Sequence, residues 1–79
     1  MAHQVEHALG PPVLTERQRQ VARGVARGLT NDEIGAELGI SPRTVKAHTD
    51  NLRRKLGVPT RRRIAPAFIA LQGQRRPRR

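Results

Sequence analysis

The chain has 79 residues, no cysteine and a formal net charge of +10. This length supports one small domain with a modest core, and the absence of cysteine excludes disulfide stabilisation. No apolar stretch approaches the roughly 20 residues of a membrane-spanning helix, and the first residues lack the apolar core of a signal peptide. We therefore expect a cytoplasmic protein that has no membrane contact.

The positive charge is concentrated in the second half of the chain. Residues 1–40 contain four arginines and five acidic residues, whereas residues 41–79 contain twelve lysines and arginines and a single acid, Asp50. Such asymmetry favours a polyanionic partner, with a solvated basic surface as the alternative. Phe68 is the only aromatic residue, which argues against RNA-binding modules that stack bases on aromatic side chains.

Residues 1–13 are expected to form a flexible N-terminal segment, because Gly10-Pro11-Pro12 stops any helix that begins earlier. His3 and His7 have the spacing of two metal ligands on one helical face. No further cluster of ligands supports them, so we expect neither a metal nor another cofactor.

Two capping boxes predict the starts of the first two helices. Thr15 and Gln18 have the spacing in which side chain and backbone cap each other, and the same pattern begins at Thr30. Gly28 and Gly39 are expected to end these helices in the left-handed conformation. The first helix therefore covers the residues after Thr15, and the second follows it after a short turn.

A third helix is expected from Ser41, which caps it, with Pro42 in the first position, to a stop at Gly57. Gly35 and Ala36, in the helix before it, are small, as a close helix crossing would require. At 100° per residue one face of the third helix is the expected core face: Val45, His48, Thr49, Leu52 and Leu56. The opposite face carries Arg43, Ala47, Asp50 and Arg54, with Lys46 and Arg53 beside it.

The fourth helix is interrupted by Pro66, which removes one backbone hydrogen bond. Either this helix is capped by Thr60 and kinked, or residues 60–63 form a loop and the helix begins near Ala65. Gly73 is expected to end it. The remaining residues, rich in arginine and interrupted by Pro77, are expected to form a disordered basic arm.

The elements together predict an all-α protein, a four-helix bundle in which the second and third helices form a helix-turn-helix. Residues 1–13 would be the flexible segment, residues 14–72 the folded domain and residues 73–79 the basic tail. In a helix-turn-helix the second of the two helices enters the DNA major groove.

Four runs of residues resemble the LuxR/FixJ-type (GerE) DNA-binding domain of bacterial transcription regulators. The runs are Leu14-Thr15-Glu16-Arg17-Gln18, Gly28-Leu29-Thr30-Asn31-x-Glu33-Ile34, Leu38-Gly39-Ile40-Ser41-x-x-Thr44-Val45-Lys46-x-His48 and Leu52-x-x-Lys55-Leu56-Gly57-Val58. The resemblance covers about residues 14–71. It implies a third helix that reads the major groove and a fourth helix that helps to form a dimer on DNA.

Three positions depart from the family pattern. Asp32 and Asp50 stand where members often carry Lys or another non-acidic residue, and Pro66 disturbs the helix that would form the dimer. No receiver or ligand-binding domain precedes the helices in this sequence. Both a free-standing regulator and a domain excised from a longer one fit that observation.

The chemistry of the third helix predicts which residues contact bases. Arg43 and Lys46 can donate to guanine O6 and N7, and Ala47 can contact a thymine methyl group. Asp50 could accept from cytosine N4, or it could pair with Lys46 or Arg54, each four residues away. His48 is expected to be a packed, structural histidine.

Further residues are predicted to contact the DNA backbone or a second copy of the chain. The expected backbone contacts are Thr30, Asn31, Thr44, Asn51, Arg54, Lys55 and Arg61. Thr30 and Asn31 are expected to offer the N-terminal amides of the second helix to a phosphate. The contacts at Thr44 and Asn51 come from the resemblance, as does a dimer contact by the fourth helix. The expected dimer contacts are Ile64, Ala67, Phe68 and Leu71.

The sequence thus predicts sequence-specific binding of double-stranded DNA that regulates transcription in bacteria, by a homodimer or with another DNA-bound protein, in the nucleoid. The alternative is a helical adaptor that docks on RNA polymerase, a sigma factor or another regulator, with mainly nonspecific DNA contact. A third hypothesis is a nonspecific nucleic-acid binder. An enzyme is not expected, because the sequence has no paired carboxylates, catalytic cysteine or metal-ligand constellation.

Overall fold

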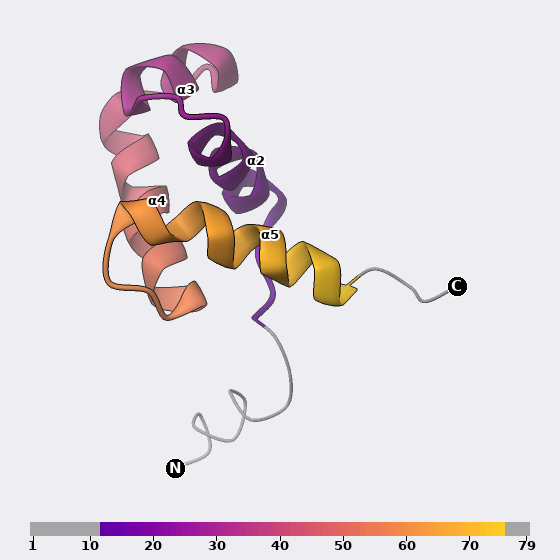
Figure 1. Ribbon diagram of the computed structural model, residues 1–79. Helices are drawn as coiled ribbons and strands as arrows, with labels where there is room; N and C mark the ends of the chain where they lie inside the picture. The colour runs from indigo at the N-terminus through magenta and orange to yellow at the C-terminus, as the bar shows by residue number, and fades with distance from the viewer. Residues whose placement is uncertain (1–11, 76–79) are drawn as a thin grey trace.

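The computed structural model describes residues 12–75 (Figure 1). Four α-helices follow one another in this range: α2 (Glu16–Ala26), α3 (Asn31–Leu38), α4 (Pro42–Leu56) and α5 (Ile64–Arg75). A short 3-10 helix, η1 (Arg61–Arg63), leads directly into α5. Since residues 12–75 contain no strand, the predicted all-α fold is confirmed. Residues 1–11 of the predicted flexible segment, with His3 and His7, and residues 76–79 of the predicted basic tail lie outside the described range.

The predicted capping boxes are present at both of the first two helices. Thr15 Oγ1 accepts from the Gln18 amide at 3.0 Å, and Gln18 Oε1 accepts from the Thr15 amide at 2.9 Å. Thr30 and Glu33 make the same exchange at 3.1 Å and 2.8 Å. Each box satisfies amides that the first helical turn leaves without a partner. The helices therefore begin where local sequence predicts.

Three glycines with positive φ end or follow the first three helices, as predicted. Gly28 has φ 83°, Gly39 has φ 73° and Gly57 has φ 70°. Ser41 caps α4 through the Thr44 amide, and the proline after it occupies the first turn. These stops leave only short connections, so that α3 and α4 pack directly against each other.

One hydrophobic core holds the helices together. Its residues come from the turn before α2 and from all four helices: Leu14, Val21, Ala22, Ile34, Val45, Leu52, Ile64, Phe68 and Leu71. Figure 1 shows α5 crossing α2 and α4, and α5 packs against both of them. The helices α3 and α4 form the helix-turn-helix. Because each helix places one face in this core, the opposite face of α4 is left exposed.

The turn between α3 and α4 depends on a glycine. A Cβ at Gly35 would lie 2.5 Å from the carbonyl oxygen of Ile40, which is backbone and cannot rotate away. The expected packing role of Gly35 is confirmed. The same role was expected for Ala36, but this expectation is wrong because Ala36 is exposed. Gly24 makes a second close approach, since a Cβ there would lie 2.7 Å from Ile34 Cγ1.

Pro66 is accommodated without breaking α5. The helix begins at Ile64, so that Pro66 is its third residue, where the missing amide has no intrahelical partner to lose. The start of α5 matches the second of the two predicted alternatives, but residues 61–63 form η1 and not the predicted loop. Thr60 makes no side-chain cap, contrary to expectation. The predicted stop at Gly73 is also wrong, because α5 continues to Arg75. Gly73 does not have positive φ, so nothing in its backbone ends the helix.

No helix within residues 12–75 is both long enough and apolar enough to cross a membrane.

Candidate nucleic-acid interface

The exposed face of α4 gathers the residues that were predicted to contact bases. Val45, Thr49 and Leu52 are buried. Their spacing turns Arg43, Lys46, Ala47 and Arg54 outward, and all four side chains are exposed. Within residues 12–75, Arg43 has neither an ion pair nor a side-chain hydrogen bond, so its guanidinium is free to bind a ligand.

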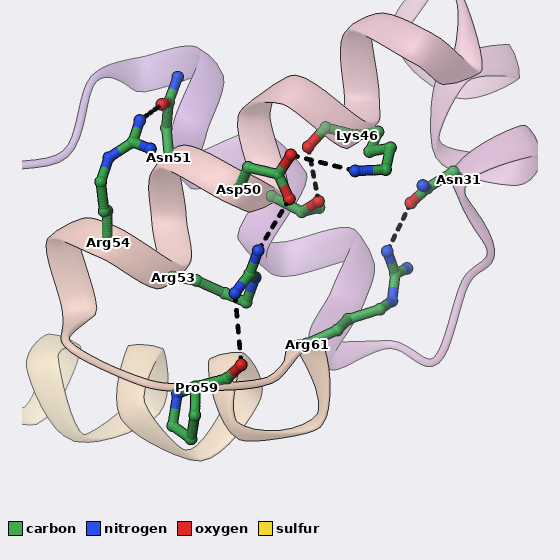
Figure 2. Close-up of polar contacts among 9 residues, drawn as sticks. Asn31, Lys46, Asp50, Asn51, Arg53, Arg54, Pro59 and Arg61 are labelled. Atoms are coloured by element: carbon green, nitrogen blue, oxygen red, sulfur yellow. Dashed lines mark hydrogen bonds and ion pairs between the residues drawn. The ribbon is translucent and has the colours of Figure 1, made fainter.

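Asp50 lies in the middle of this face and carries two ion pairs (Figure 2). Its Oδ2 lies 3.1 Å from Lys46 Nζ, and its Oδ1 lies 3.1 Å from Arg53 Nη2. These two cations hold the pKa of the Asp50 carboxyl below its ordinary value, with the Arg53 hydrogen bond as the larger cause and the Lys46 hydrogen bond second. The predicted pair with Lys46 is confirmed. The alternative partner, Arg54, is wrong, and Arg53 takes its place.

Arg53 connects this cluster to the loop that follows α4. Its Nη1 donates to the carbonyl oxygen of Pro59 at 3.3 Å, while its Nη2 contacts Asp50. No role was predicted for Arg53 beyond its place beside the exposed face of the helix. The signal was the spacing of three residues from Asp50, which also brings side chains together on a helix.

Three predicted backbone-contact residues of α4 have side-chain partners on the same helix or at its cap. Arg54 Nη2 donates to Asn51 Oδ1 (Figure 2). The Thr44 hydroxyl lies 3.0 Å from the Ser41 hydroxyl, within the cap of α4. Arg54 and Asn51 therefore share one edge of the exposed face, and Thr44 lies at its N-terminal end.

Arg61 joins η1 to the start of α3. Its Nη1 donates to Asn31 Oδ1, and its Nη2 donates to the carbonyl oxygen of Leu29 at 2.8 Å. Thr30 lies beside them, and all of these residues line one open hollow. The structure thus brings three of the predicted backbone contacts together: Thr30, Asn31 and Arg61.

The expected use of the Thr30 amide needs a correction. That N–H donates to Glu33 Oε1 at 2.8 Å, within the capping box, so it is occupied. A phosphate at this helix terminus would meet the amides of the next residues and the Arg61 guanidinium instead.

Lys55 lies apart from the other predicted contacts. Its Nζ donates to the carbonyl oxygen of Val13 at 3.0 Å and to Gln18 Oε1 at 3.2 Å. The last turn of α4 packs beside the start of α2, and the ammonium is held there. Its side chain is therefore directed toward α2 and not toward the cluster at Lys46 and Asp50.

The structure contradicts three of the four predicted dimer contacts. Ile64, Phe68 and Leu71 are 0%, 1% and 4% exposed in the core of their own chain. They cannot reach a second copy unless the fold opens. Ala67 is half-buried. The exposed side of α5 carries Pro66, Ile69, Ala70 and Gly73 instead.

No cluster of three or more histidine, cysteine, aspartate or glutamate side chains in the described part of the chain could hold a metal ion. His48 is half-buried on the edge of the core face. The polar side chains of the candidate interface are instead cations, amides, hydroxyls and one carboxylate.

Comparison with known proteins places these features in a family. Residues 12–67 match the family described as bacterial regulatory proteins, luxR family. The transcriptional regulatory protein UhpA of Escherichia coli is 58% identical over 45 residues, which is 57% of this chain and 23% of that protein. The nitrate/nitrite response regulator protein NarP of Escherichia coli is 48% identical over 60 residues, 76% of this chain and 27% of that protein.

A third relative extends the match to most of the chain. The transcriptional regulatory protein LiaR of Bacillus subtilis is 42% identical over 65 residues, which is 82% of this chain and 31% of that protein. The chain thus spans between about a quarter and a third of the length of these relatives. The family match covers well over half of the chain and contains α2, α3, α4 and the first turn of α5. The chain therefore belongs to the luxR family of bacterial regulatory proteins.

Proposed function

We propose that this protein binds double-stranded DNA sequence-specifically, with α4 in the major groove, and thereby regulates transcription in a bacterial cytoplasm, at the nucleoid. The observation that carries the proposal is the exposed, cationic face of α4 within a helix-turn-helix. Relatives named as transcriptional regulatory proteins support the regulatory role. A helix of this diameter fits the major groove, whose base edges distinguish all four base pairs.

In this proposal three side chains of α4 read bases. Arg43 and Lys46 are long, exposed and near the N-terminal half of α4. Each donates to guanine O6 or N7, and Arg43 does so with two nitrogens. Ala47 lets the helix approach closely and contacts a thymine methyl group. Asp50, on the same face, is the fourth residue of this reading surface.

The backbone contacts lie on both sides of that surface. Arg54, Asn51 and Thr44 border it on α4, while Arg61 and Asn31 lie together at the start of α3. Cations and amides at these places neutralise or hydrogen-bond phosphates and so fix the position of α4 on the duplex. Lys55 contributes to this set only if its ammonium leaves Val13 and Gln18, its present partners.

A dimer in this proposal uses the outer side of α5. Ile69 is 58% exposed, an unusual state for a large aliphatic side chain, and Pro66, Ala70 and Gly73 beside it are exposed too. Small residues flanking one large apolar residue allow two helices to approach closely. Two copies related by twofold symmetry would then bind two half-sites about one helical turn apart.

The experiment that tests the proposal is selection of bound duplexes from a random pool, followed by fluorescence titration at fixed physiological salt. The selected site is expected to bind at least about a thousandfold more tightly than a shuffled duplex. Arg43→Ala and Lys46→Ala should each weaken binding to the selected site by about 1–3 kcal/mol. Arg17→Ala, an exposed residue of α2 with the same change in charge, is the control. Equal affinity for all duplexes would refute sequence-specific binding.

The adaptor hypothesis makes the opposite prediction for these variants. Ile64 and Phe68 cannot test it, since they are core residues whose replacement unfolds the chain. Ile69→Asp tests it instead, because this side chain is exposed. If Ile69→Asp abolished regulation in cells while Arg43→Ala and Lys46→Ala did not, docking on RNA polymerase, a sigma factor or another regulator would replace DNA reading as the function.

A further inference from the structure

Asp50 is an acid in the centre of a surface that is otherwise cationic. It is the single acidic residue among residues 41–79, against twelve lysines and arginines. A carboxylate that faces the phosphates of DNA is repelled by them, so Asp50 lowers affinity for any duplex. Its presence on the reading face therefore needs a compensating effect.

The geometry supplies one, because Asp50 links the exposed Lys46 to Arg53, which also bonds the backbone of the loop after α4. Lys46, Asp50 and Arg53 have side chains that are 68%, 38% and 36% exposed, so the cluster runs from solvent toward the protein. At its inner end Arg53 holds both Asp50 Oδ1 and the carbonyl oxygen of Pro59. At its outer end Asp50 Oδ2 holds Lys46 Nζ (Figure 2).

Both carboxylate oxygens are thus directed by contacts within the protein. Ion pairs this exposed contribute little to stability. Their effect is to restrict where the side chains lie. A lysine has a flexible four-carbon stem and a compact charge, and an unrestrained one contacts phosphates on any sequence. A lysine whose ammonium is held in one place contacts one base edge.

We propose that Asp50 is a positioning residue for sequence selectivity, which orients Lys46 toward one base pair and is itself held by Arg53. This inference rests on the proposed function and deepens it. Selectivity is the ratio of specific to nonspecific affinity. Asp50 raises this ratio because the restraint on Lys46 favours the specific site, whereas the repulsion of phosphates acts on every duplex alike.

The experiment is a double-mutant cycle on three sets of duplexes. Asp50→Asn, Lys46→Ala and the double variant are titrated against the selected site, its single-base-pair substitutions and a shuffled duplex. Asp50→Asn should bind the shuffled duplex about threefold more tightly, as loss of one repulsive charge several ångströms from phosphate implies. At the base pair that Lys46 reads, the variant should also lose about tenfold in its preference for the selected base pair over the substituted ones. The double variant should lose no more preference than Lys46→Ala alone.

Glu16→Gln is the charge-matched control. Glu16 pairs with Arg23 at 3.4 Å on α2 and is 70% exposed. The Glu16→Gln substitution changes the net charge by the same amount as Asp50→Asn. Any effect of net charge alone should therefore appear in both variants. Glu16→Gln should keep the full preference at every base pair.

Three outcomes overturn the positioning role. In the first, Asp50→Asn keeps the wild-type preference at every base pair of the site. Another is a loss at a different base pair from that of Lys46, additive in the double variant, which means that Asp50 accepts directly from a base such as cytosine. The third is a wild-type protein with no preference, which refutes the proposed function first and leaves Lys46 with nothing to read.

Arg53→Gln provides a second variant in case Asp50→Asn fails to fold, which circular dichroism would reveal. This substitution keeps the Asp50 charge but removes the guanidinium that holds it. The proposal is supported if Arg53→Gln loses preference at the base pair affected by Lys46→Ala, by a smaller factor than Lys46→Ala does. An unchanged preference overturns it. NMR of the Lys46 ammonium in the free protein adds a readout that a merely stabilising role would not change: its motion should increase in both variants.

Discussion

Gly35→Ala should destabilise the protein although alanine is the better helix former. The added Cβ would lie 2.5 Å from the carbonyl oxygen of Ile40 and 3.5 Å from the nitrogen of Pro42, both backbone atoms of the turn. Alanine favours a helix interior by about 1 kcal/mol over glycine. Overpacking against atoms that cannot rotate away costs about 1–3 kcal/mol. A 2.5 Å approach to a backbone oxygen lies at the severe end of that range, so the expected net loss is about 2 kcal/mol.

That loss is a large fraction of the stability of so small a domain, which is about 3–5 kcal/mol. Urea unfolding followed by circular dichroism measures it as a lower midpoint with an unchanged slope. Gly73→Ala is the matched control, because a Cβ there meets nothing within 4 Å and α5 is helical around it. It should raise stability by up to about 1 kcal/mol. A Gly35→Ala variant as stable as the wild type would refute the close approach of α3 to the turn.

Further predictions concern the ion pairs, the core and the caps. Arg53→Gln should raise the pKa of Asp50 toward its ordinary value, as measured by NMR titration of the carboxyl carbon, because Arg53 is the larger cause of the shift. Since the folded pKa is lowered, the stability that this pair contributes is present above the ordinary carboxyl pKa and is lost as pH falls through the lowered one. Phe68→Ala should cost about 3–5 kcal/mol, which is the whole stability of so small a domain, since the ring is 1% exposed; circular dichroism without urea should therefore show a largely unfolded chain. Ile69→Asp should leave stability nearly unchanged but weaken self-association in sedimentation experiments. Ser41→Ala should cost about 1 kcal/mol by loss of its cap at the start of α4.

Local sequence predicted those parts of the fold that depend on residues three or four apart. The capping boxes at Thr15 and Thr30 and the left-handed Gly39 involve only neighbours along the chain. Their chemistry is therefore visible in the sequence. The same reasoning predicted the Lys46–Asp50 pair but chose the wrong second partner. Arg53 and Arg54 are both close enough on a helix, and their other partners differ: Arg53 also bonds the Pro59 carbonyl, whereas Arg54 bonds Asn51.

Contacts between distant residues could not be predicted in this way. Lys55 bonds Val13 across 42 residues, and Arg61 bonds Leu29 across 32 residues. Long cationic side chains reach many acceptors, and which one they meet depends on how the helices pack. The sequence therefore identified these residues as cations but not as cations that hold the chain's own backbone.

The dimer contacts were misassigned for a related reason. The apolar pattern of α5 shows that one face is buried, but it does not distinguish burial in the chain's own core from burial against a second copy. Phe68 fills the core, and the less conspicuous Ile69 is exposed. The stop predicted at Gly73 was wrong because Gly73 does not adopt the positive φ with which Gly39 and Gly57 cap their helices.

Protection of guanine N7 from methylation in the selected duplex tests the central claim most directly. N7 faces the major groove, where α4 is proposed to lie. We expect the wild-type protein to protect at least one guanine in each half-site, and Lys46→Ala or Arg43→Ala to restore its reactivity. Full reactivity of every guanine in a duplex saturated with protein would contradict major-groove reading by α4.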